Sequence, residues 1–376
     1  MRKGGFIVVI CIFIFVLRYL LILLLLSSSA SAQVLGGKNV YSFLDLPAAP
    51  QITALGGVNV SQQNNDLSLA LLNPALLRPS MHTHLQVNYA SYFAGVKYLH
   101  AATAFHVPSV ATTFATSLQY VGYGDITHTD AAGNVMGTFR PNDLVWQVSA
   151  SRQYLEKWHY GLSVKYIHSR YQQYQSSGIS TDVGIAYQDT ARGWQAGLVA
   201  KNMGTQFSTY DGAGEKEPLP FDLQIGISKR LAHIPLQLSA TLHHIYQFDI
   251  RYADPGFEDG TVIENGDTTS RGSGTVDKIF RHFVLAAQFE VGKYVELTAA
   301  YNHLRRKELA MMSQQGLSGF SLGIGVIVNK IQLRFARSWY QRTVAFNHLG
   351  ISLPLNQWMG LGKFGDRIGW KPDGPL

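Results

Sequence analysis

One short motif in the sequence matches the pattern of a catalytic serine. Gly319-Phe320-Ser321-Leu322-Gly323 fits G-x-S-x-G, in which the serine occupies a sharp turn between a strand and a helix and acts as a nucleophile. Here the motif lies inside a segment of alternating residues. Phe320 and Leu322 therefore share one face of an expected strand and Ser321 the other. Because no strand-to-helix turn is expected, we predict that Ser321 is not catalytic and that the protein is not an enzyme.

Two groups of histidines could supply imidazole ligands to a metal. They are His82-Thr83-His84 and His243-His244. No acidic residue or third histidine stands at a ligand spacing near either group, so we expect no metal site and no cofactor. The only cysteine, Cys11, lies in the apolar N-terminal segment, which excludes disulfides and thiolate sites from the rest of the chain.

A basic triplet, Arg305-Arg306-Lys307, falls in an expected loop. Guanidinium groups bind phosphate and carboxylate with paired hydrogen bonds, so this triplet is a candidate contact for lipopolysaccharide or a partner. A solvated cluster of loop charges is the alternative. The longest expected loop, 247–280, is acidic and is the candidate protein-docking surface, although solvation alone would also explain its composition. Its charged residues are Asp249, Asp254, Glu258, Asp259, Glu264, Asp267 and Asp277 against Arg251, Arg271 and Lys278.

The elements that must position these residues show a period of two. In the segment 221–228, Phe221, Leu223, Ile225 and Ile227 alternate with Asp222, Gln224, Gly226 and Ser228. Only 15% of the residues are charged while 46% are hydrophobic, and the mean hydropathy is only +0.02. A sheet with one apolar face and one uncharged polar face has this composition, whereas a bundle of membrane helices does not.

The alternation predicts an all-β protein of about fourteen strands. We expect them at 84–92, 97–107, 111–121, 143–152, 160–168, 179–188, 193–202, 219–228, 235–246, 281–291, 294–302, 317–327, 330–337 and 346–353. Short turns on one side and longer loops on the other, near 122–142, 203–218, 247–280 and 303–316, are typical of antiparallel outer-membrane β-barrels. In lipid every backbone polar group must pair, which favours a closed sheet. A soluble sandwich or propeller is the alternative, but a sandwich would need a charged outer face.

Charged residues of the expected inner face have two interpretations. Lys165, Lys201, Glu296 and Arg334 would pair across the interior of a plugged barrel, or tune selectivity in a conducting one.

The two ends of the chain differ from the expected barrel at 82–354. Arg2 and Lys3 precede an apolar run and the Ala30-x-Ala32 pattern, which predicts a signal peptide at 1–32 and an outer-membrane location; an uncleaved anchor is the alternative. Residues 33–81 do not alternate and are expected to form a hatch or plug, and 355–376 an irregular tail. The formal net charge of +7 comes without any basic run interleaved with aromatics, so we expect no nucleic-acid partner.

The expected hatch carries a family resemblance. Ala54-Leu55-Gly56-Gly57-Val58-Asn59-Val60-Ser61, then Asp66, then Asn73-Pro74-Ala75, resembles the N-terminus of the fourteen-stranded fatty-acid-transporter-type (FadL-like) barrels. Within that group, the opening segment 36–47 and the stretches 219–226 and 301–308 resemble the PorV/PorQ family of the type IX secretion system. One departure is Leu76, where the fatty-acid transporters usually have glycine, which weakens the inference of a mobile transport hatch.

The resemblance implies a non-enzymatic anchor or scaffold in the cell-surface attachment complex for secreted cargo. The implied partners are a PorZ-like surface protein, a PorU-like sortase, a PorV-like barrel and anionic lipopolysaccharide. A FadL-like transporter of hydrophobic small molecules is the alternative. An apolar tunnel to a lateral opening would favour transport, and a lumen closed by 33–81 would favour the anchor.

Overall fold

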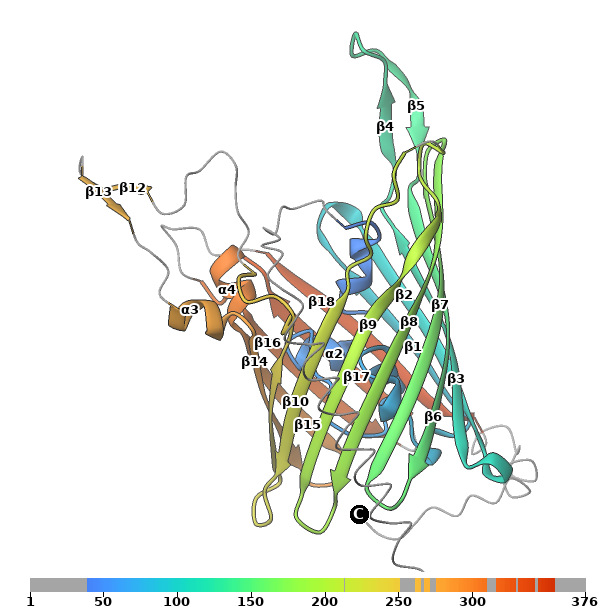
Figure 1. Cartoon of the computed structure of the whole chain (residues 1–376), viewed down its shortest axis with the longest axis vertical. Coiled ribbons are helices and arrows are strands. Elements are labelled where there is room, and N and C mark those ends of the chain that lie inside the picture. The colour runs from blue at the N-terminus through green and yellow to red at the C-terminus, as the bar shows by residue number, and fades with distance from the viewer. Residues whose placement is uncertain are drawn as a thin grey trace, which may run out of the picture. The chain divides into compact units, whose positions relative to one another are not determined.

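The computed structural model describes residues 39–212, 214–250, 261–264, 267–270, 275–309, 316–328, 331–341 and 344–355. Fourteen of the described strands form one closed antiparallel barrel, in which β1 pairs with β18 (Figure 1). The barrel strands are β1 (His84–Ser91), β2 (Lys97–Val107), β3 (Thr112–Gly122), β6 (Asn142–Tyr154), β7 (Trp158–Tyr171), β8 (Tyr174–Asp189), β9 (Trp194–Ser208), β10 (Asp222–Arg230), β11 (Leu236–Leu242), β14 (Phe283–Val291), β15 (Val295–Asn302), β16 (Phe320–Val328), β17 (Ile331–Trp339) and β18 (Ala345–Pro354).

The period-two pattern separates the two faces of the wall. In β10, Ile225 and Ile227 are 44% and 48% exposed on the outside, while Gln224 and Ser228 are almost fully buried inside. An apolar outside and a polar inside, with every strand paired on both edges, is what the hydrocarbon layer requires. The protein is an integral outer-membrane β-barrel, as predicted.

The predicted number of barrel strands is confirmed, and their positions agree within a few residues. The strands β6 to β9 are longer than expected, with 13 to 16 residues. About 9–11 residues span the hydrocarbon layer, so these strands continue beyond it.

Some expected loops contain regular structure. The segment 122–142 includes a hairpin of β4 (Ile126–Thr129) and β5 (Val135–Phe139), and the segment 247–280 includes β12 (Thr261–Glu264), β13 (Asp267–Ser270) and α3 (Thr275–Phe280). The expected loop 303–316 begins with α4 (His303–Leu309). No described helix is long and apolar enough to cross a membrane.

The long connections of the barrel all lie at one of its ends. Residues 155–157, 190–193 and 231–235 join neighbouring strands at one end, which we call the short-turn end. At the opposite, long-loop end, 209–221 join β9 to β10 and 243–282 join β11 to β14. At the short-turn end the Trp158 and Tyr187 rings lie 5.0 Å apart, and Lys229 Nζ lies 4.5 Å from the centre of the Trp194 ring. Aromatic and basic groups of this kind are typical of a membrane interface.

Residues 39–81, which we call the hatch, are largely buried and pack against the inner face of the wall. The hatch consists of short helices joined by extended segments: η1 (Ser42–Asp45), α2 (Pro50–Ala54), η2 (Leu67–Leu71), η3 (Pro74–Leu76) and η4 (Pro79–Met81). Two further short helices, η5 (Phe93–Gly95) and η6 (Pro108–Val110), lie in turns. Leu55, Leu69 and Leu76 of the hatch are fully buried, so the apolar core of this barrel lies inside its lumen.

Candidate functional site at the hatch and the long-loop end

Asn73 forms hydrogen bonds both within the hatch and to the barrel strands, which we call the wall. Its Nδ2 donates to the carbonyl oxygens of Val60, at 3.0 Å, and of Ile185 in β8, at 3.4 Å. Its Oδ1 accepts from the backbone N–H of Ala75 at 3.0 Å and so caps η3, whose first residue is Pro74. An asparagine cap followed by proline is a favoured start for a helical turn. The Asn-Pro-Ala motif therefore holds this part of the hatch against β8.

Glycines of the wall give the hatch room to approach. A Cβ placed on Gly161 would overlap with Pro74 and Ala75, one on Gly184 with Asn73, and one on Gly197 with the Val60 carbonyl. Gly161 and Gly184 are opposite each other in the β7–β8 register. The wall thus has a strip without side chains where the hatch backbone lies against it.

The Gly56–Gly57 pair turns the hatch at a second contact with the wall. Both residues have positive φ, +86° and +92°, which disfavours any residue with a side chain. The Gly56 carbonyl accepts from Asn302 Nδ2 at 3.1 Å and from Arg305 Nη2 at 3.2 Å. All five predicted residues of the hatch motif therefore lie at or beside contacts between hatch and wall.

Ion pairs inside the lumen connect the hatch to β17 and β15. Arg334 of β17 lies with its Nε 3.0 Å from Asp66 Oδ2 of the hatch and its Nη1 2.7 Å from Glu296 Oε2 of β15. Arg334 Nη1 also donates to Gln51 of the hatch. Lys165 and Asp182 form a second buried pair, with 2.7 Å between Nζ and Oδ2. Three of the four predicted lumenal charges thus form ion pairs, as expected in a plugged barrel.

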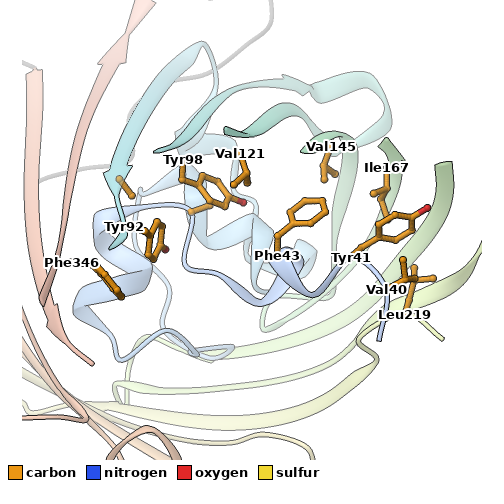
Figure 2. Close-up of a cluster of buried hydrophobic side chains, with 12 residues drawn as sticks. Val40, Tyr41, Phe43, Tyr92, Tyr98, Val121, Val145, Ile167, Leu219 and Phe346 are labelled. Atoms are coloured by element: carbon orange, nitrogen blue, oxygen red, sulfur yellow. The ribbon is translucent and has the colours of Figure 1, made fainter. Parts of the chain in front are cut away.

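Apolar side chains close the lumen toward the long-loop end. Figure 2 shows Tyr41 and Phe43 of the hatch among the inward-facing Val121, Val145 and Ile167. The Tyr41 hydroxyl also hydrogen bonds to Ser176 Oγ at 2.6 Å. Deeper in the lumen, a cavity of about 30 Å³ lined by hatch residues and by Gln119, Gln147, Lys165 and Lys201 has room for little more than a water molecule.

The basic triplet lies on α4, and its two arginines bond within the chain. Arg305 Nη1 donates to Ser338 Oγ at 2.6 Å, and the guanidinium stacks on Tyr340 at 4.4 Å. Arg306 Nη1 donates to the carbonyl oxygens of Gly316, at 3.1 Å, and Ser318, at 3.3 Å. The Lys307 side chain is 48% exposed, so it is the member of the triplet that is best placed to meet an outside ligand.

Part of the predicted acidic docking loop lies outside the described residues, namely 251–260, 265–266 and 271–274, which include Asp254, Glu258, Asp259, Arg251 and Arg271. Two of the described acidic groups, Asp249 and Asp277, form ion pairs nearby. Asp249 Oδ2 lies 2.8 Å from Lys278 Nζ, and Asp277 contacts Arg281 at 2.9 Å and Lys307 at 3.5 Å. These pairs join α3, α4 and the beginning of the loop.

The β4–β5 hairpin offers a second surface at the long-loop end (Figure 1). Val135 and Met136 are 69% and 65% exposed there. Arg140 pairs with Asp125 beside the hairpin, and the guanidinium lowers the pKa of that carboxyl group. The sequence predicted only a longer loop at 122–142, because the two strands are too short to show a clear period.

The other candidates for chemistry lie inside the barrel or at its end. Ser321 is buried in β16 and hydrogen bonds to Ser338 Oγ at 3.0 Å, not to a histidine. His82 Nδ1 accepts from the backbone N–H of His106 at 2.9 Å. His243 and His244 lie beside Asp222, a residue that sequence spacing did not connect with them because it precedes them by a whole β-hairpin. Pairing of β10 with β11 was the signal that could have found it.

Comparisons with known proteins give likenesses of fold. No family model matches the chain, and no curated protein matches it. Among solved structures it is similar to a mutant of the TodX monoaromatic hydrocarbon channel, with 13% identity and a TM-score of 0.48 over 83% of this chain and 98% of that one. It is also similar to a Pseudomonas aeruginosa FadL homologue, with 12% identity and a TM-score of 0.41 over 81% and 97% of the two chains. The KdgM porin gives 6% identity and a TM-score of 0.32 over 72% and 98%.

Proposed function

We propose that this barrel is a non-enzymatic anchor at the cell surface, of the PorV/PorQ kind, in the complex that attaches cargo of the type IX secretion system. The observation that carries the proposal is the filled lumen. Hatch side chains such as Leu55, Leu69 and Leu76 have no exposed surface, and the cavity beside them holds about 30 Å³. A barrel filled in this way presents its ends to partners instead of passing a solute.

The contacts of the hatch support a fixed plug. Arg334 forms ion pairs with the hatch residue Asp66 and the wall residue Glu296 in a buried setting. Removing one partner of such a pair commonly costs about 3–5 kcal/mol, because a buried charge is left alone. Displacing the hatch would break this network and expose three apolar clusters at the same time.

The long-loop end supplies the surface for a protein partner. The β4–β5 hairpin exposes Val135 and Met136, and α3 and α4 are held together through Asp277. We propose that a PorZ-like surface protein docks on this end, near a PorU-like sortase and a PorV-like barrel. Lipopolysaccharide would meet the triplet mainly through Lys307, which is the most exposed of its three residues.

One observation favours the alternative, a FadL-like transporter of hydrophobic small molecules. An apolar hollow of about 700 Å³ lies on the outer face of the wall, lined by Ile185, Leu198, Ile225, Gly197 and Gly226. A Cβ on Gly197 or Gly226 would touch Val60 of the hatch, so only backbone separates the hollow from the hatch. A hydrophobic molecule would pass here only if the hatch moved and the paired strands β9 and β10 separated beside Gly197 and Gly226.

A photo-crosslinking experiment tests the anchor proposal. A crosslinking amino acid replaces Val135 in the hairpin, and the matched control replaces Tyr294 at the short-turn end, since the two side chains are 69% and 66% exposed. After irradiation of cells, the barrel is isolated and captured proteins are identified by mass spectrometry. We expect a large surface protein at position 135 and none at 294. The proposal fails if neither position captures one, or if deleting the gene abolishes uptake of a hydrophobic nutrient while secretion and surface attachment continue.

A further inference from the structure

Three side chains with metal-binding atoms converge at the long-loop end of β10 and β11. They are Asp222, the first residue of β10, and His243 and His244, which follow the last residue of β11. One ligand atom from each lies within 4.8 Å of the others. We propose that Asp222, His243 and His244 bind a divalent transition-metal ion, for which Zn²⁺ is the best fit. This inference does not depend on the anchor function.

The backbone is bent in a way that brings two consecutive histidines to one site. In a strand, neighbouring side chains point to opposite faces, so His243 would face the lumen and His244 the membrane. Instead, His244 has a φ of +53°, in the left-handed region that non-glycine residues rarely adopt. Its ring therefore turns back, and His244 Nδ1 lies 2.6 Å from His243 Nδ1 and 3.7 Å from Asp222 Oδ2. This conformation of His244 is what brings the two rings and the carboxylate to one side of the chain.

Protein contacts alone do not satisfy His243. Its side chain is nearly fully buried, and its Nε2 has no hydrogen-bond partner among the described residues. If Nδ1 donates to His244, Nε2 is a buried acceptor without a donor; if Nδ1 accepts, Nε2–H is a buried donor without an acceptor. Each tautomer leaves an unpaired buried nitrogen, which is costly. A metal ion at this cluster would replace the hydrogen bond between the two Nδ1 atoms and take one lone pair from each ring, and the proton of His243 would then lie on Nε2.

The carboxylate of Asp222 is already oriented. Its Oδ1 accepts from the backbone N–H of His244 at 2.6 Å, and its Oδ2 accepts from Gln224 Nε2 at 2.5 Å. Outer partners of this kind hold ligating groups in place in metal sites. The nearby charges are mixed: Lys201 lies opposite Asp222 in the β9–β10 register, and the hatch residue Asp45 interacts electrostatically with both Lys201 and His244.

The ligand set indicates the ion. Zn²⁺ binds imidazole nitrogen and carboxylate oxygen at about 2.0–2.2 Å, which places ligand atoms roughly 3.3–3.5 Å apart in a tetrahedron. The two separations given above lie on either side of this range, so a small rotation of the two rings accommodates the ion. Two histidines and one aspartate leave a fourth position for water or for a ligand from outside. Ca²⁺ and Mg²⁺ prefer oxygen ligands and would not select this cluster.

A bound ion would link the residues at which two connections of the long-loop end meet the wall. Asp222 ends the connection 209–221, and His243 begins the connection 243–282. This link would fix the base of the longest connection at the long-loop end, beside the hatch residue Asp45. The expected consequence is that Zn²⁺ raises the thermal unfolding midpoint of the wild-type barrel, because a ligand that binds only the folded state stabilises it.

Metal titration of the full-length barrel tests the proposal. The protein is purified in detergent without a polyhistidine tag, dialysed against chelator, and titrated with Zn²⁺ against a chromophoric chelator. We expect one Zn²⁺ per chain, and a loss of affinity on the order of 100-fold or more in Asp222→Asn, His243→Gln and His244→Gln. The matched control, His303→Gln, removes another histidine beside an aspartate, since His303 Nε2 lies 3.2 Å from Asp277 Oδ1. It should bind Zn²⁺ as the wild type does.

Two further measurements keep the result decisive. Heat-dependent migration on gels shows whether each variant is folded, and electron paramagnetic resonance of the wild-type protein loaded with Cu²⁺ counts coordinated nitrogens without any substitution. We expect coupling to two imidazole nitrogens. A wild-type protein that binds no Zn²⁺, folded variants that bind it equally well, or a Cu²⁺ spectrum without imidazole coupling would overturn the proposal.

Discussion

Arg334 and Asp66 form an ion pair across the hatch–wall boundary, with 3.0 Å between Nε and Oδ2 and side chains that are only 6% and 1% exposed. Replacing Arg334 with methionine leaves the buried carboxylate of Asp66 and the partly buried carboxylate of Glu296 without their cation. We expect the free energy of unfolding to fall by about 3–5 kcal/mol, and the hatch to become more sensitive to protease than the wall. Urea unfolding in detergent and limited proteolysis provide the two measurements.

The control for this prediction is Arg140→Met, which breaks an ion pair whose side chains are 79% and 55% exposed. Exposed pairs contribute little because water screens them. Equal stability of the Arg334 and Arg140 variants would contradict the role of Arg334 in holding the hatch.

The close approach of Asn73 to Gly184 predicts a steric effect. A Cβ on Gly184 would overlap with Asn73 Oδ1, so Gly184→Ala should push the hatch from the wall. Overpacking of this kind costs about 1–3 kcal/mol. The same substitution at Gly122 meets only the ring of Tyr120, at 3.2 Å, and should change the unfolding free energy much less. Comparing the two variants by urea unfolding checks this, and a neutral Gly184→Ala would show that the hatch is not seated against β8.

Two residues of the basic triplet are expected to have different roles, Arg305 in stability and Lys307 in binding lipopolysaccharide. Arg305 bonds to the Gly56 carbonyl of the hatch and to Ser338, so Arg305→Ala should destabilise the barrel by about 2 kcal/mol. Lys307→Ala should leave stability nearly unchanged and should weaken lipopolysaccharide association, measured by co-sedimentation with lipopolysaccharide. If Lys307→Ala binds lipopolysaccharide as the wild type does, the triplet is not a lipopolysaccharide contact.

The barrel could be predicted from the sequence because alternation is a local property. Residues 221–228 show their two faces in eight consecutive letters, and β10 has that pattern in the structure. Strand pairing then follows from short connections and from the need to close the sheet in lipid. The β4–β5 hairpin escaped the same reasoning because its strands have four and five residues, with no buried face.

The contacts inside the lumen could not be predicted in this way. Arg305 stands next to Arg306 in the sequence, and only the direction of α4 decides that Arg305 reaches Gly56 of the hatch. Asp222 and His244 meet because of strand register and one left-handed residue, and a slip of one residue would turn one of the two side chains to the other face. The spacing of residues in the sequence indicates neither the Arg305–Gly56 contact nor the Asp222–His244 contact.

Covalent locking of the hatch distinguishes the anchor from the transporter. Ser61 of the hatch and Ser228 of β10 have their Oγ atoms 2.8 Å apart, which suits replacement of both by cysteine and formation of a disulfide. The only natural cysteine is Cys11, so the new pair has no competitor within residues 33–376. We expect the oxidised Ser61→Cys/Ser228→Cys protein to keep surface attachment of cargo, measured by the amount of cargo on intact cells.

The matched control for the lock is Ser149→Cys/Ser163→Cys, in which two residues of neighbouring wall strands, with Oγ atoms 2.7 Å apart, are joined to each other and not to the hatch. An anchor works with its plug fixed, so both oxidised proteins should support attachment equally and neither should change uptake of hydrophobic nutrients. A transporter that opens by moving the hatch would lose uptake only in the Ser61→Cys/Ser228→Cys protein and regain it with a reductant. That second pattern, with attachment unaffected by deleting the gene, would replace the anchor with the transporter, because the same filled lumen would then be the closed state of a gate.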